Sequence, residues 1–67
     1  MTRSQIRAFV QESNLERIRE VLNGLQRLRN HVPLEGLPEA EQRFLLDLRD
    51  HEEFFRGLAD ARLRAGA

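Results

Sequence analysis

The sequence contains no cysteine, lysine, tryptophan or tyrosine. Without cysteine, neither a disulfide framework nor a thiolate metal site can stabilise the fold. Long apolar runs are also missing, because the longest, Phe44-Leu45-Leu46, is far shorter than the ~20 residues of a membrane span. The N-terminus leads into no apolar segment, so we expect no secretory signal, no membrane association and a cytoplasmic location.

A chain of 67 residues allows one small domain, residues 1–67. Such a chain buries only ~60% of its unfolded surface, so it needs very good helix packing or association with another chain. The only hydroxyl groups belong to Thr2, Ser4 and Ser13, each of which is explained as a helix cap or its neighbour. There is no glycine-rich phosphate loop, so we predict a protein that is not an enzyme and uses no cofactor or small-molecule substrate.

Two helices are predicted in the N-terminal half. Thr2-Arg3-Ser4-Gln5 fits a capping box and opens a short helix over about 3–12. Ser13 with Glu16 forms a second box, although one continuous helix with a polar interruption is an alternative. The apolar residues that follow are spaced by three and four, which predicts a helix over 15–31. Gly24 lies inside this helix, where a small residue lets another helix approach closely.

The third helix is predicted over 38–63. Pro33 and Gly36 interrupt the helical pattern before this helix, and Pro38 with Glu39 is typical of a helix start. A helix of ~26 residues would be about 39 Å long, which is longer than the second helix. Its apolar face is also wider than one neighbouring helix covers.

These elements predict an all-α fold: a short N-terminal helix, then a long antiparallel helical hairpin, with the bundle completed by dimerisation or a partner. The N-terminal helix can instead cover the remaining apolar surface, which gives a three-helix bundle. Whether residues 1–12 pack within the chain or swap between chains is open.

The wide apolar face of the third helix predicts a protein-binding surface. Aromatic and arginine side chains dominate such contacts. The expected partner-binding residues are Phe44, Leu48, Phe54, Phe55 and Leu58, with Arg49 and Arg56 at the rim. The function predicted from this face is that of a small bacterial or phage modulator, which binds a larger protein or forms a homodimer.

The alternative is a nucleic-acid-binding regulator that uses the arginine-rich N-terminal half. Residues 1–34 carry six arginines and three glutamates, and the expected contact residues are Arg3, Arg7, Arg19 and Arg27. A helix-turn-helix would use residues 3–12 and 15–29, but the junction lacks the glycine that often shapes this turn. The net charge of zero and the pI near 6.7 also differ from the usual basic composition.

Asp47 and His51 are spaced by four residues and could ligate one metal ion. Helical proteins that hold di-iron repeat such pairs on several helices. The matching inward-facing acids are not evident elsewhere in this chain, so we predict no metal site. An ion-paired surface patch is the expected role of this segment.

About 20 residues of the C-terminal half carry a family resemblance: Leu37-Pro38-Glu39-Ala40-Glu41-Gln42, then Leu48-Arg49-Asp50-His51 and Phe55-Arg56. With a one-residue gap, they resemble the second helix of the Rop family of plasmid copy-number regulators. Thr2-Arg3 looks similar to the start of that family's first helix, which carries the RNA face. The resemblance implies a helical hairpin that dimerises, and RNA binding on the first helix. The loop here is longer than in that family.

Overall fold

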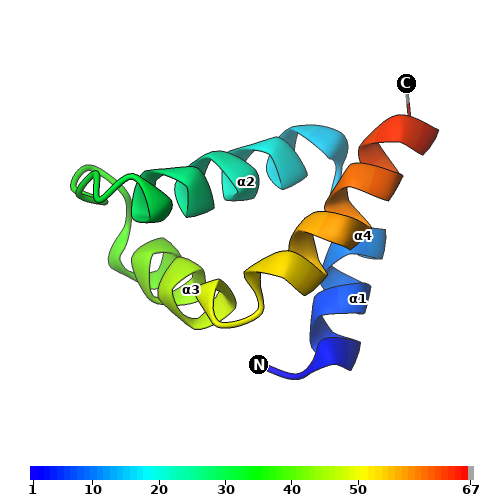
Figure 1. Cartoon of the computed structure of the whole chain (residues 1–67), viewed down its shortest axis with the longest axis horizontal. Helices are drawn as coiled ribbons and strands as arrows, with labels where there is room; N and C mark the ends of the chain where they lie inside the picture. The colour runs from blue at the N-terminus through cyan, green and yellow to red at the C-terminus, as the bar shows by residue number, and fades with distance from the viewer. Residues whose placement is uncertain (67) are drawn as a thin grey trace.

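The computed structural model describes residues 1–66, which form an all-α fold without strands. The helices are α1 (Arg3–Glu12), α2 (Leu15–Arg29), α3 (Glu39–Arg49) and α4 (Glu52–Ala65). α2 packs against both α3 and α4, and α1 packs mainly against α4. Figure 1 shows α1 beside α4 at one end of the molecule and the α2–α3 loop at the other.

Local capping explains where the first two helices begin. The hydroxyl of Thr2 accepts a hydrogen bond from the backbone N–H of Gln5, whose side chain accepts one from the N–H of Thr2, so the predicted capping box is confirmed. The second box is wrong by one residue, because Asn14 rather than Ser13 caps α2 and accepts from the N–H of Arg17. Ser13 is extended, which ends α1 and excludes one continuous helix.

The second helix ends at Arg29, two residues before the predicted end. His31 adopts the left-handed conformation with φ 57° and closes a Schellman motif. In this motif the N–H of Val32 donates to the carbonyl of Arg27 at 2.8 Å, and the N–H of His31 donates to that of Leu28 at 3.2 Å. The guanidinium of Arg27 then donates to the carbonyl of Pro33 and holds the loop against the helix.

The single helix predicted over 38–63 is wrong, because the chain bends at Asp50 and His51 between α3 and α4. A straight helix of about 39 Å would exceed the longest dimension of the molecule, 31 Å. The 15 residues of α2 span only about 22 Å, too short to cover it. The bend lays both halves on α2 and brings α4 against α1 (Figure 1). A long antiparallel hairpin is therefore not confirmed, and dimerisation stays a prediction.

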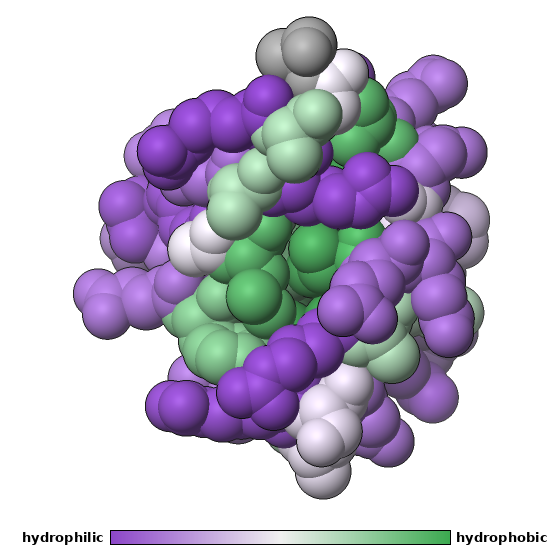
Figure 2. Space-filling view, turned by 90° about the vertical axis from the view of Figure 1, so that its right-hand side faces the viewer, coloured by the Kyte–Doolittle hydropathy of each residue, from purple (hydrophilic) through white to green (hydrophobic). Residues whose placement is uncertain are grey.

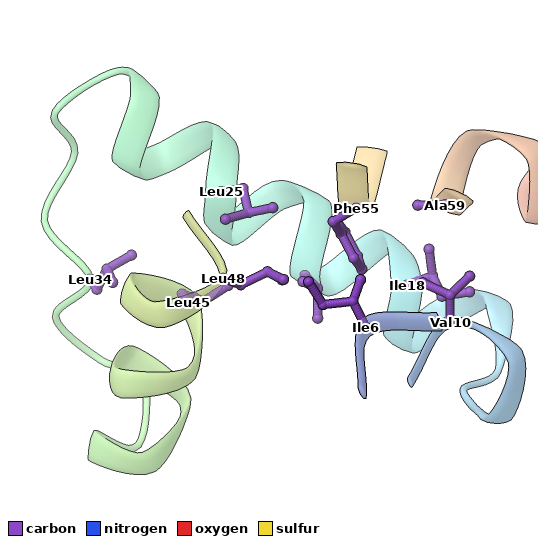
Figure 3. Packing of buried hydrophobic residues seen from close by; sticks show 10 residues of the cluster. Ile6, Val10, Ile18, Leu25, Leu34, Leu45, Leu48, Phe55 and Ala59 are labelled. Carbon is purple, nitrogen blue, oxygen red and sulfur yellow. The ribbon is translucent and has the colours of Figure 1, made fainter. Parts of the chain in front are cut away.

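The core contains residues from every helix and from the α2–α3 loop (Figure 3). It consists of Ile6, Val10, Ile18, Val21, Leu25, Leu34, Leu45, Leu48, Phe55 and Ala59. A Cβ at Gly24 would lie 2.5 Å from a methyl group of the buried Leu45 side chain, so any larger residue at this position forces Leu45 to move where α2 meets α3. The close approach expected at this position is confirmed.

An ion pair joins α2 to α3 beside this core. Both terminal nitrogens of Arg17 donate to the carboxylate of Glu41, at 2.6 and 2.7 Å. The same guanidinium lies 5.7 Å from the centre of the Phe9 ring and 5.8 Å from that of Phe44. The hydrogen bonds from Arg17 lower the pKa of the Glu41 carboxyl below its usual 4.5. One arginine therefore contacts side chains from α1 and α3.

Replacing Glu41 with glutamine should lower the free energy of unfolding at pH 7 by about 1–2 kcal/mol. A bidentate ion pair becomes a hydrogen bond from the charged guanidinium to the single oxygen of a neutral amide. The folded pKa of Glu41 is lowered, so its stabilisation is complete above its ordinary value of 4.5 and is lost as the pH falls through the folded value. Urea unfolding between pH 2.5 and 7 measures this effect. Glu39→Gln is the control, because the Glu39–Arg43 pair is almost fully exposed. Equal losses in the two variants would contradict the prediction.

Candidate interaction surface

Two residues of the predicted partner-binding surface lie in the core. Phe55 is 0% exposed and Leu48 is 1% exposed. Both side chains lie in the core that α1 and α2 cover, and the Phe55 ring lies beside Ile6 of α1 (Figure 3). Their prediction as partner contacts is therefore wrong for the folded chain, because α1 and α2 cover the face that a straight helix would leave open.

Phe44 lies apart from the other predicted contact residues. Its half-buried ring packs against Phe9 with centroids 5.0 Å apart and planes tilted by 49°. The two rings line a shallow groove of about 400 Å³ between α1 and α3, together with Gln5 and Asp47. Phe44 thus belongs to the contact between α1 and α3.

Phe54 and Leu58 do come together, on the outer side of α4 next to α1. Both are half-buried and pack on the edge of the core. Two arginines of α1 cover the Phe54 ring, with the guanidinium of Arg3 at 4.7 Å and that of Arg7 at 5.3 Å from its centre. These are cation–π distances, and they fix the arginines beside an apolar surface.

The surface continues along α4 through small residues. Gly57 and Ala61 follow Phe54 at helical spacing and both are exposed. Figure 2 shows the side of the molecule formed by α1 and α4, where apolar side chains gather between polar ones. We call this surface the Phe54 face; it consists of Arg3, Arg7, Phe54, Gly57, Leu58 and Ala61.

No contact among residues 1–66 requires glycine at position 57. Nothing lies within 4 Å of where its Cβ would be, whereas the same atom at Gly24 would collide with Leu45. Glycine inside a helix costs about 1 kcal/mol relative to alanine. The position therefore lowers the stability of α4 and leaves an open surface over which another backbone could approach closely.

A second groove, of about 310 Å³, adjoins the Phe54 face at the bend. Arg3, Arg49 and Phe54 line it, so the predicted rim residue Arg49 lies next to the face. Arg56 has a different role, because its guanidinium lies 3.7 Å from the carboxylate of Glu52, which also pairs with Arg29. Glu52 links α4 to the end of α2 through Arg29, and Arg56 supports this carboxylate from within α4.

The four arginines of the nucleic-acid alternative do not form one surface. Arg3 and Arg7 lie on the Phe54 face. Arg27 donates to carbonyl groups of the α2–α3 loop. This loop lies at the end of the molecule opposite α1 and α4 (Figure 1). Arg19 is exposed on α2. The packing of α1 mainly on α4 also differs from a helix-turn-helix, in which the first two helices form the unit.

The bend also separates the two residues considered for metal binding. Asp47 lines the groove beside Phe44, whereas His51 lines the groove beside Phe54. Among residues 1–66, no group of three histidine, aspartate or glutamate side chains could hold a metal ion.

The comparisons with known proteins give no relative. No family model matches the chain, and no curated protein or solved structure matches it. The Rop resemblance therefore stays a prediction. Within the described part of the chain, no helix is long and apolar enough to cross a membrane.

The sequence predictions do not include Gly57 and Ala61, although the spacing of these residues indicates that they share a helix face with Phe54. Phe54, Gly57, Leu58 and Ala61 repeat at intervals of three and four, as the core positions do. Two such stripes run side by side on α4, and the one that contains Phe55 is buried. The half-buried stripe is recognisable only once the position of α1 is known.

Replacing Gly57 with alanine should raise the free energy of unfolding by about 1 kcal/mol, because alanine favours the helix and its methyl group meets open space. Gly24→Ala should instead lower it by about 1 kcal/mol, since the gain in helix propensity is smaller than the cost of overpacking against Leu45. Urea unfolding of the two variants measures the difference. A destabilised Gly57→Ala protein would show that Gly57 has a role inside the chain.

Proposed function

We propose that this chain is a small, non-enzymatic interaction protein that binds a partner protein through the Phe54 face. The observation that carries the proposal is Gly57, a helix-interior glycine on an exposed surface without a structural reason in the chain. Glycine is the usual residue where another backbone or a ligand must approach a chain closely. A small cytoplasmic modulator of bacterial or phage origin is the class that best fits the length and composition.

The composition of the face supports a protein partner. Aromatic and arginine side chains are the residue types that contribute most to protein interfaces. Phe54 and Leu58 provide half-buried apolar surface, and two guanidinium groups border it. An apolar side chain of the partner could cover Phe54 and Leu58 while its own backbone lies over Gly57.

The charges of the face indicate the chemistry of the partner. Within residues 1–66, neither Arg3 nor Arg7 forms an ion pair. Stacking on Phe54 leaves the N–H groups at the edge of each guanidinium free to bind a carboxylate in a bidentate geometry. An acidic amphipathic helix, which presents apolar side chains beside carboxylates, fits this arrangement.

Gly57→Arg should reduce capture of the partner from native cell extract at least tenfold, because a long charged side chain replaces open space on the face. Leu46→Arg is the matched control, since Leu46 is 44% exposed on α3, away from the face. Tagged wild-type and variant chains are compared by quantitative mass spectrometry after nuclease treatment. Circular dichroism first establishes that both variants fold. If the wild-type chain and the Gly57→Arg variant capture the same proteins in equal amounts, the proposal is overturned.

Filter binding separates this function from nucleic-acid binding. Of the four predicted nucleic-acid contacts, only Arg3 and Arg7 lie together, which is too few basic groups for strong binding to phosphates. We therefore expect the protein to retain no hairpin RNA or duplex DNA on the filter at about 50 mM salt. Retention that falls steeply with salt and disappears in an Arg3→Gln, Arg7→Gln double variant would favour the nucleic-acid alternative instead.

A further inference from the structure

The bend between α3 and α4 has no local cause in the sequence. Residues 48–52, Leu-Arg-Asp-His-Glu, contain neither proline nor glycine. Asp50 keeps helical angles, and only His51 departs from them, with φ −122° and ψ 25°. The bend is therefore imposed by the packing of α3 and α4 on the other helices.

The bend also leaves backbone groups without helical partners. The first N–H groups of any helix have no acceptor within it, and side-chain caps usually supply one. No side chain caps the start of α4. A straight helix through residues 50–52 would give these N–H groups the carbonyl partners that they lack in the bent form.

The buried positions keep one helical register across the bend. Leu45 and Leu48 precede it, Phe55 and Ala59 follow it, and Glu52 occupies the position between them. Steps of three and four separate all five, so a straight helix presents them on one face. Straightening requires no residue of α3 or α4 to change from a buried face to an exposed one.

We infer that two copies of this chain exchange α4. In the exchanged dimer, His51 becomes helical, α3 and α4 form one continuous helix, and α4 of each copy packs on α1 and α2 of the other. The contacts of α4 with α1 and α2 are then the same as in the single chain. The less extensive contact between α3 and α4 is lost, and the hinge gains helical hydrogen bonds. Exchange of an identical element is a common route to symmetric dimers.

This inference does not rest on the proposed function. The exchanged dimer rebuilds each Phe54 face from α1 of one copy and α4 of the other, so binding of a partner is compatible with it. The two ideas also fail separately, because exchange depends on the helix propensity of the hinge and partner binding depends on the surface at Gly57.

Alanine and glycine at position 51 provide a matched test. His51→Ala should increase the dimerisation constant about twentyfold relative to His51→Gly, because alanine favours the straight helix and each dimer contains two hinges. Sedimentation equilibrium of the full chain, refolded at a series of concentrations, measures both constants. Asp60→Ala and Asp60→Gly are the controls: Asp60 is exposed and helical in both forms, so this pair should change stability and leave the dimerisation constant unchanged.

A distance measurement identifies the geometry of the dimer. Spin labels are attached at Arg43→Cys and Arg64→Cys of one chain, and the labelled chains are diluted with unlabelled chains so that each dimer contains one labelled copy. The separation of the two labels should be about 32 Å along a straight helix in the dimer fraction. It should be shorter in the monomer. Dimers with the short separation, or equal constants for His51→Ala and His51→Gly, would overturn the exchange and indicate ordinary face-to-face association. A chain that stays monomeric with alanine at position 51 at millimolar concentration would overturn it as well.

Discussion

The length of α2 is the constraint on which the rest of the structure depends. Its 15 residues extend about 22 Å, whereas the apolar stripe of the C-terminal half would occupy a straight helix of about 39 Å. The chain resolves this mismatch with the bend at Asp50 and His51. The cost is the loss of a few helical hydrogen bonds, and the gain is burial of Leu48 and Phe55 within one polypeptide.

Sequence patterns predicted the features that depend on neighbouring residues. The all-α class, the first capping box and the glycine where α2 meets α3 all follow from such local chemistry. The bend could not be predicted in this way, because the apolar register passes through residue 51 without interruption and no helix-breaking residue marks it. Its cause lies in helix lengths and in the position of α1, which are properties of the assembled fold.

The candidate surface was only partly predictable for the same reason. Phe54 and Phe55 are adjacent in sequence and equally apolar, so the sequence predicts one wide binding face that contains both. In the structure α4 turns Phe55 into the core and leaves Phe54 half-buried beneath two arginines. Which of the two is buried depends on the side from which α1 approaches, and α1 is separated from α4 by about forty residues of sequence.

The folded chain covers most of the apolar surface that the sequence assigns to a partner. Among residues 1–66, Val32 and Leu46 are the only large apolar residues that remain exposed. The chain therefore does not need a partner to hide its core. The features that still favour a partner are specific contacts. Arg3 and Arg7 have free N–H donors beside the Phe54 ring, and Gly57 leaves open space next to them. Specific recognition requires such placement more than it requires area.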